Sequence, residues 1–168
     1  MDLIVSITAG LASSYFFLVF FLYQKKPIIA ISENISLVKF NGEDNYTFKF
    51  VNLTPAVIFD VRVELTFYKP VGDFKGNNLQ GSDIKLKDNF IAYIPRSNDN
   101  DSFNLHAMRL RTTDNLPDLW KDKSSFIRLT IIGKHALSGF NQVFVKDFLS
   151  VDCITTKKFQ SGNYLTVK

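Results

Sequence analysis

The stretch 46–68 constrains the fold more than any other part of the sequence. Between residues 57 and 67 every second residue is apolar, and the positions between them are mostly polar. This period-two alternation predicts a strand with one buried face. We expect its inward side chains to include Phe59, Val61, Val63 and Leu65. A shorter alternation precedes it, so two strands joined by a turn need a second sheet to cover their apolar faces.

Other short segments have the same character, and the 17 phenylalanines of the chain suit sheets. Segment 116–120 reads as one helical turn. In segment 103–109 apolar residues occur at both odd and even positions, so the sequence does not show which face of that strand is buried. Short strands with turns between them and no long amphipathic helix predict an all-β fold, a β-sandwich. The remaining expected strands are 28–32, 35–40, 84–87, 90–94, 126–132, 143–151 and 164–167.

The N-terminal 24 residues predict a transmembrane helix. The stretch from Leu3 to Tyr23 carries no charge and has the length that spans a bilayer core. A signal peptide usually has basic residues before its apolar region and a small-residue cleavage site after it. Here the only charged residue before the apolar stretch is Asp2, so we expect a retained anchor (1–24) followed by a soluble domain (25–168).

Two lysines decide the expected orientation of that anchor. Lys25 and Lys26 follow the apolar stretch, and the positive-inside rule places such residues on the cytoplasmic side. We therefore expect a single-pass protein of the inner (cytoplasmic) membrane with its C-terminal domain in the cytosol. The two lysines fit contacts to anionic lipid, although plain positive-inside flanking explains them equally well.

The anchor also carries a stripe of small residues. Ser6, Gly10 and Ser14 are spaced four apart, which places them on one face of a helix. Such a stripe lets a second helix approach closely, so the residues are candidates for self-association. The alternative is that small residues are simply common in membrane helices.

The soluble domain is mildly basic. Residues 25–168 hold all 20 basic and 15 of the 16 acidic residues, a net charge of +5. Clustered guanidinium and ammonium groups fit phosphate oxygens, so a nucleotide or another anionic small molecule is a possible ligand. The mixed charge argues against a track for long nucleic acid. A solvated basic face is the alternative reading of the candidate residues Arg109, Arg111, Lys121, Lys123 and Arg128.

Catalytic and metal-binding signatures are not found in the sequence. His106, His135 and the lone Cys153 have no metal-ligand spacing, and one cysteine excludes an intrachain disulfide. There is no nucleophile elbow and no phosphate-cradling glycine loop. Segment 98–102 lacks the glycine and distal glutamate of a calcium loop, so a solvated turn is the simpler reading. We expect no enzyme, no cofactor and no metal.

The order of several motifs resembles the cytoplasmic domain of inward-rectifier potassium channels. The match runs through 25–34, Phe40-Asn41-Gly42, 48–53 and 60–63, with a weaker match over 129–148. The resemblance implies an immunoglobulin-like sandwich and assembly as a tetramer, with the anchor in the place of the inner helix. The chain lacks the outer helix, the pore helix and the Thr-Val-Gly-Tyr-Gly filter, and Thr54 stands where the family has arginine. Potassium selectivity built from filter carbonyls is therefore excluded for this chain by itself.

Two functions fit these expectations. The first is a membrane-anchored sensor or effector whose sandwich binds an anionic ligand, a nucleotide messenger being the leading candidate, and which acts as a homo-oligomer. The second is a membrane-tethered scaffold or accessory subunit that holds a protein partner. A basic pocket favours the first, and an exposed apolar patch favours the second.

Overall fold

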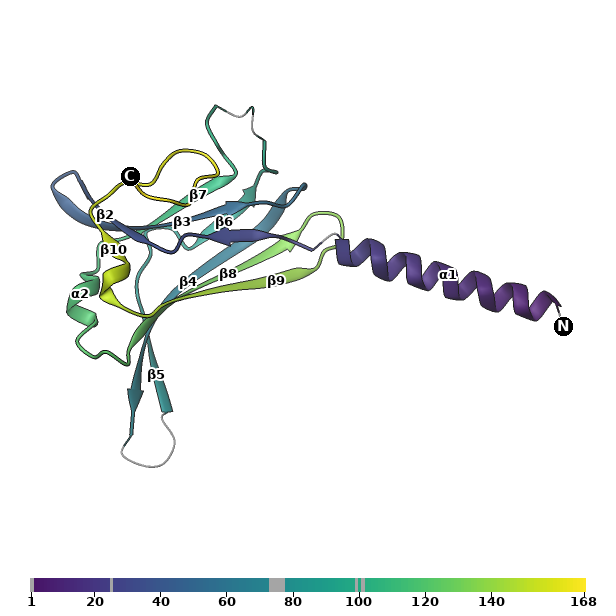
Figure 1. The fold of residues 1–168 in the computed structure, drawn as a ribbon, viewed down its shortest axis with the longest axis horizontal. Coiled ribbons are helices and arrows are strands. Elements are labelled where there is room, and N and C mark those ends of the chain that lie inside the picture. Colours follow the sequence, from purple (N-terminus) through teal and green to yellow (C-terminus); the bar gives the residue numbers. More distant parts are fainter. Residues whose placement is uncertain (1, 25, 73–77, 99, 101) are drawn as a thin grey trace.

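The computed structural model describes residues 2–24, 26–72, 78–98, 100 and 102–168. A long N-terminal helix leads into a mostly β body made of two sheets (Figure 1). The expected β-sandwich with one N-terminal helix is confirmed.

Helix α1 (Asp2–Gln24) stands clear of the sandwich. Its residues 3–24 are long and apolar enough to cross a membrane, and none of them is buried inside the structure. A helix with exposed apolar side chains all round is typical of a membrane-spanning segment. The structure thus agrees with a single-pass anchor and leaves its orientation open.

The first sheet is built around strand β3 (Glu43–Asn52). Strands β1 and β2 pair with one edge of β3, and β7 pairs with its other edge. A short strand near the C-terminus, β10, extends the sheet by pairing parallel to β2. The partner strands are β1 (Ile29–Ile31), β2 (Ile35–Phe40), β7 (Ala107–Thr112) and β10 (Ile154–Thr155).

The second sheet is built around strand β4 (Ile58–Val71). Strands β5 and β6 pair with one edge, β8 pairs with the other, and β9 follows β8. The far end of β4 forms an arm with β5 that projects from the body (Figure 1). The other elements are β5 (Asn78–Asp83), β6 (Phe90–Ile94), β8 (Phe126–His135), β9 (Asn141–Phe148), the helical turn α2 (Leu116–Leu119) and the 3-10 turn η1 (Val151–Cys153).

The core lies between the two sheets. Phe48 of β3 meets Phe148 of β9 edge to face, with ring centroids 5.4 Å apart. The pairing of β7 with β3 settles the orientation that the sequence left open, because Leu110 lies opposite the inward Phe48. Arg109 and Arg111 therefore point out of the sandwich.

The turn between β2 and β3 is tighter than expected. Asn41 and Gly42 both have positive φ, 52° and 83°, as the two central residues of a type I′ turn require. Asparagine and glycine tolerate this left-handed backbone better than other residues. The sequence predicted a turn over 41–44, but β3 already begins at Glu43.

A β-bulge makes the prediction for Phe59 wrong. The register between β4 and β8 shifts between Phe59 and Arg62, and Asp60 has a φ of 50°. One extra residue reverses the faces on its two sides. Ile58 is therefore buried and Phe59 is 42% exposed, whereas Val61, Val63 and Leu65 face the core as expected.

Several expected boundaries also differ. Segment 84–87 is not a strand, although Ile84 and Leu86 are buried. Strand β5 was not predicted, because its sequence is polar with a glycine and all of its residues are exposed. Residues 103–106 precede β7, the strand β8 continues through Gly133 to His135, and 164–167 contributes only a bridge between Phe159 and Val167.

The register of β4 predicts opposite outcomes for two adjacent substitutions. Val63→Asp puts a carboxylate without a partner into the core, and we expect it to lower the free energy of unfolding by about 4 kcal/mol. Arg62 is exposed, so Arg62→Ala should change that energy by no more than about 0.5 kcal/mol. Thermal unfolding of the detergent-solubilised chain, followed by circular dichroism, compares the two. Equal melting temperatures would mean that the register is wrong.

Candidate functional site

The outer face of the first sheet carries a buried lysine. Lys49 of β3 is only 1% exposed, although strand alternation points it away from the core. Its ammonium donates hydrogen bonds to the backbone carbonyls of Gln160, Gly162 and Tyr164 at 2.6, 2.7 and 2.7 Å. Burial and the nearby charge of Arg109 lower the pKa of Lys49 from 10.5 to about 8. The three carbonyls offset part of the cost of burying this charge.

The C-terminal segment 157–168 covers that face and is fixed along its length. The hydroxyl of Ser36 donates to the carbonyl of Lys157 at 2.6 Å, and that of Ser32 donates to the carbonyl of Leu165 at 2.9 Å. Arg109 donates from Nη2 to the carbonyls of Phe159 and Gln160 at 3.3 and 3.2 Å. These bonds fix the segment, in which Phe159 and Val167 form an isolated bridge, over the outer face of the first sheet.

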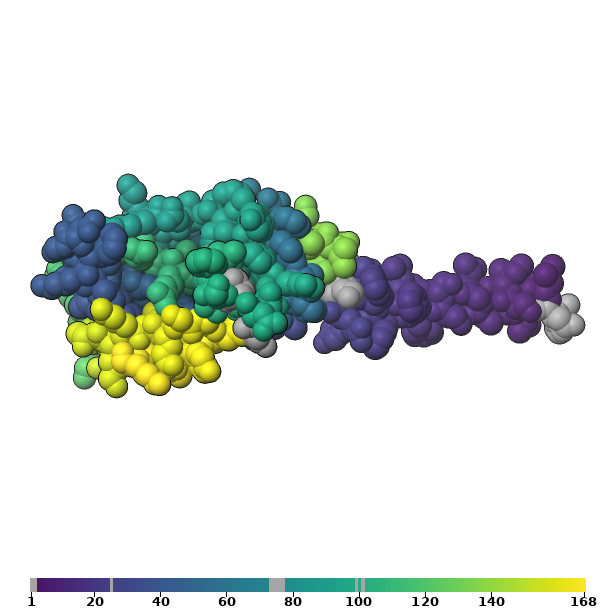
Figure 2. All heavy atoms as spheres, turned by 90° about the horizontal axis from the view of Figure 1, so that it is seen from above, coloured from purple at the N-terminus to yellow at the C-terminus, as the bar shows by residue number. Residues whose placement is uncertain are grey.

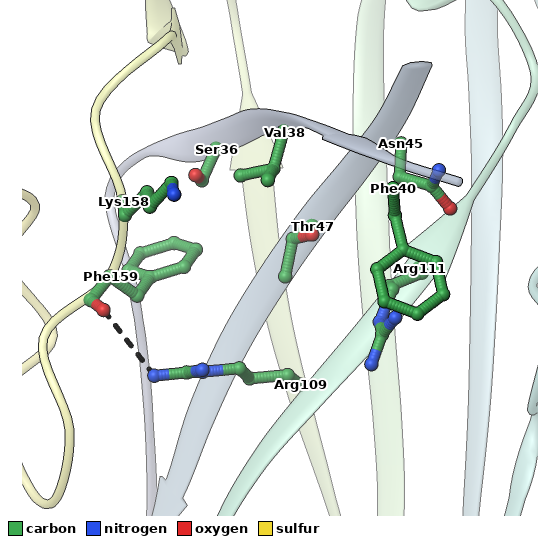
Figure 3. A pocket seen from close by; sticks show the side chains of 9 residues that line it. All are labelled: Ser36, Val38, Phe40, Asn45, Thr47, Arg109, Arg111, Lys158 and Phe159. Carbon is green, nitrogen blue, oxygen red and sulfur yellow. Dashed lines mark hydrogen bonds between the residues drawn. The ribbon is translucent and has the colours of Figure 1, made fainter. Parts of the chain in front are cut away.

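A pocket of about 210 Å³ lies between this segment and the β2–β3 hairpin. Figure 3 shows Arg109, Lys158 and Phe159 at one end and Arg111, Phe40 and Asn45 at the other. Three cations and no carboxylate line it. We call it the basic pocket, and its walls are Ser36, Val38, Phe40, Asn45, Thr47, Arg109, Arg111, Lys158 and Phe159.

Strand register explains why these side chains meet. Thr47 of β3 pairs with Ser36 on one side and with Arg111 on the other, so the three form a row across the sheet. Arg109 lies two residues from Arg111 and opposite Lys49, on the same outer face. Because side chains of one strand alternate between faces, Arg109 and Arg111 must share a face.

The end of the pocket near the hairpin combines charge, an aromatic ring and an amide. The guanidinium of Arg111 lies over the ring of Phe40, 5.1 Å from its centroid. Asn45 is 1% exposed and donates from Nδ2 to the carbonyl of Glu43 at 3.0 Å. No donor among the described residues reaches its Oδ1. A buried acceptor in this condition is costly, so this end of the pocket is polar but incompletely satisfied.

Only two of the five expected ligand-binding residues lie in the basic pocket. Arg109 and Arg111 are there, but Lys121 and Lys123 are exposed in the loop after α2. Arg128 lies on β8 in the second sheet, where it donates two hydrogen bonds to Asp147 at 2.7 and 2.8 Å. These bonds raise the pKa of the Arg128 guanidinium and compensate its charge, so the prediction of one cluster of five is wrong.

The sequence reading missed the contributions of Lys158, Phe159, Phe40 and Asn45 to the pocket. The pairing of β2 with β3 could have placed Phe40 and Asn45 on one face, because a tight hairpin fixes their register. Nothing in the sequence marks Lys158 and Phe159, since their place depends on where the C-terminal segment crosses the sheet.

The expected membrane residues are placed only in part. Lys26 lies over the ring of Tyr23, 4.5 Å from its centroid, at the end of α1, and Lys25 lies outside the described residues. Ser6, Gly10 and Ser14 are exposed along α1. A Cβ added to Gly10 would meet no atom within 4 Å, so that helix face is open to a neighbour.

No family model matches the chain, and no curated protein matches it either. What the pocket can bind must therefore be inferred from its own chemistry.

The contacts of Lys49 predict a local rather than a global effect of its removal. Lys49→Met keeps the length of the side chain but deletes the donor that binds three carbonyls. We expect amide exchange in 157–168 to quicken on the order of tenfold, because a charged hydrogen bond is worth about 1.5 kcal/mol or more. Hydrogen–deuterium exchange with mass spectrometry on the full chain measures it. Lys39→Met, at an exposed position of β2, is the matched control. Unchanged protection of 157–168 in Lys49→Met would show that other contacts hold the segment.

Proposed function

We propose that the chain is a non-enzymatic, membrane-anchored sensor or effector whose sandwich binds an anionic small molecule, with a nucleotide messenger as the leading candidate. The observation that carries the proposal is the basic pocket, where Arg109, Arg111 and Lys158 meet without a carboxylate. Guanidinium forks bind phosphate oxygens in a bidentate way, and an ammonium adds a point charge. An anion would relieve the repulsion among three neighbouring cations.

The rest of the lining suits the other parts of a nucleotide. The ring of Phe40, which is 51% exposed, offers a surface on which a base can stack. The hydroxyls of Ser36 and Thr47 can bond to a sugar or a phosphate. The volume of about 210 Å³ favours a ligand of small size over a polymer.

The pocket also suggests how binding could be transmitted. The guanidinium of Arg109 holds the carbonyls of Phe159 and Gln160, so a bound phosphate would compete with the C-terminal segment for the same donors. A ligand shifts a conformational equilibrium only when it binds one state better than the other. In this proposal the two states differ in how tightly segment 157–168 is bound to the sheet, and the ligand binds better to the state in which Arg109 has released the segment.

The proposed setting is the cytosolic face of the inner membrane, with α1 as a single-pass anchor. Lys25 and Lys26 after the helix support this orientation through the positive-inside rule. A single helix cannot line a pore, so an action on the membrane requires several copies. The resemblance to inward-rectifier cytoplasmic domains makes four subunits the favoured number.

A scaffold or accessory subunit is the second candidate function. Val143 and Val145 of β9 are 54% and 51% exposed on the outer face of the second sheet. Within the described residues β9 pairs only with β8, so its other edge is open. An open strand edge beside apolar side chains is a place where a protein partner can add a strand.

Ligand binding is tested with the full chain in detergent micelles. Isothermal titration with inorganic phosphate, AMP and ATP should show binding that weakens as salt is raised. We expect Arg111→Gln to reduce affinity on the order of tenfold or more, because it removes a charged hydrogen bond. Lys121→Gln is the matched control, since Lys121 is exposed outside the pocket. Native mass spectrometry of the extracted protein identifies any retained molecule. No binding, or equal losses in both variants, would leave the scaffold as the better candidate.

Self-association through α1 is tested by adding bulk to one face of the helix. Gly10→Leu fills the stripe of Ser6, Gly10 and Ser14 and should shift the protein toward smaller species in detergent, because close backbone approach is lost. Ala12→Leu adds the same bulk on nearly the opposite face and should leave assembly unchanged. Analytical ultracentrifugation measures both. A monomeric wild type would refute the homo-oligomer, and an oligomer indifferent to Gly10→Leu would place its contacts in the sandwich.

A further inference from the structure

Three segments that are distant in sequence meet at the end of the sandwich where α1 joins it. Ile28 accepts a hydrogen bond from the backbone of Leu53 at 2.9 Å and donates to the hydroxyl of Thr54 at 2.8 Å. The backbone of Ala136 donates to the carbonyl of Val57 at 3.3 Å. The β8–β9 loop accordingly lies beside the end of α1 in both views (Figures 1 and 2).

Each of these segments exposes large apolar side chains. Leu137 at the tip of the β8–β9 loop is 70% exposed, and Ile28, Phe140 and Leu53 are 51%, 46% and 45% exposed. We call these four residues the apolar rim. Scattered apolar side chains are ordinary on protein surfaces. A group of them at one end of a domain indicates a surface that binds another molecule or a membrane.

Hydrogen bonds hold the loop that carries Leu137 in one conformation. Nδ1 of His135 accepts hydrogen bonds from the backbones of Leu137 and Ser138 at 3.2 and 3.3 Å. The backbone of His135 donates to Phe140 at 3.0 Å, and Gly139 takes the left-handed backbone with a φ of 69°. The fold thus holds the loop in place with the Leu137 side chain 70% exposed.

Together, the three segments that form the rim carry basic residues and no acidic ones. Lys26 and Lys134 flank it, and the segments 26–32, 53–57 and 134–140 contain no aspartate or glutamate. Basic residues beside exposed apolar side chains are the combination that binds to the interface of an anionic bilayer.

We infer that the apolar rim inserts into the headgroup and outer acyl region of the leaflet from which α1 emerges. This inference rests on the anchor in the proposed function but not on the basic pocket. Ile28 lies two residues after Lys26, a reach of at most about 7 Å of extended chain. Interfacial side chains are buried about 5–10 Å deep, so a sandwich tethered this closely has its rim within the interface. The bilayer, rather than a protein partner, is thereby the occupant that chain continuity places on this surface.

Docking by the rim would also fix the orientation of the sandwich relative to the membrane. A sandwich held only by a single chain could turn freely about it, whereas a rim in the interface fixes its tilt. The residues that line the pocket lie on the outer face of the first sheet and in the C-terminal segment, and none of them belongs to the rim, so docking leaves the pocket open to the surrounding solution.

The test uses the full chain reconstituted into vesicles whose acyl chains carry bromine, which quenches nearby tryptophan. The single native tryptophan, Trp120, follows α2 at the end of the sandwich away from α1 and serves as an internal reference (Figure 1). Leu137→Trp adds a tryptophan at the rim. Leu79→Trp, on the projecting β5 arm and 52% exposed, is the matched control.

We expect the added emission of Leu137→Trp to be quenched by brominated lipid, and that of Leu79→Trp and of the wild type to be unchanged. Circular dichroism of the same vesicles verifies that each variant is folded, and Phe140→Trp repeats the test at a second rim position. Unquenched emission at both rim positions in a chain that floats with the vesicles would overturn the inference. A chain that does not float would overturn the anchor and the rim together. Failure of anion binding in the titrations, with quenching intact, would affect the pocket alone.

Discussion

The architecture of the outer face of the first sheet depends on one buried ammonium. Lys49 is placed outward by strand alternation and is covered by the C-terminal segment. The backbone carbonyls of residues 160, 162 and 164 accept hydrogen bonds from its ammonium. Burying an unpaired charge costs several kcal/mol, so the segment and the lysine require each other. Segment 157–168 has few backbone hydrogen bonds of the kind that join strands. The three bonds from Lys49, which we call the polar cap, therefore help to hold the segment where strand pairing holds other parts of the sandwich.

The basic pocket is a consequence of that cap. Lys158 and Phe159 reach the sheet only because the segment is held there, and they close one side of a groove whose other walls come from β2, β3 and β7. Arg109 belongs to both systems, since it lines the pocket and also donates to the covering segment. The same side chain therefore joins the wall of the pocket to the covering segment. Arg128 shows the contrast: paired with Asp147 on the other sheet, it has no charge left uncompensated for a ligand.

The two ends of the sandwich have different chemistry. The β2–β3 hairpin end carries Phe40, Arg111 and the incompletely bonded Asn45, which suits a small polar ligand. The end beside α1 carries apolar side chains and lysines, which suits a lipid interface. The strands separate these surfaces along their length, so a sandwich docked by its rim would present its pocket to the surrounding solution.

Local patterns in the sequence determined the apolar helix, most strands, the sandwich and the fact that Arg109 and Arg111 share a face, because residue spacing within one short segment carries that information. Which way that face points was decided by the pairing of β7 with β3. The same patterns failed at Phe59, because one bulge residue turned its side chain to the outer face of the sheet. At the bulge Gly133 lies so close to Ile58 that a Cβ on Gly133 would clash with the Ile58 side chain. Nearness in sequence also grouped Lys121, Lys123 and Arg128 with Arg109 and Arg111, although the two lysines lie in the loop after α2 and Arg128 lies on the second sheet. Only the tertiary structure decided that Lys49 is buried and that Lys158 and Phe159 complete a pocket. The hydrogen bonds of Lys49 join residues more than 100 positions apart, and no local preference encodes which carbonyls a distant ammonium will contact.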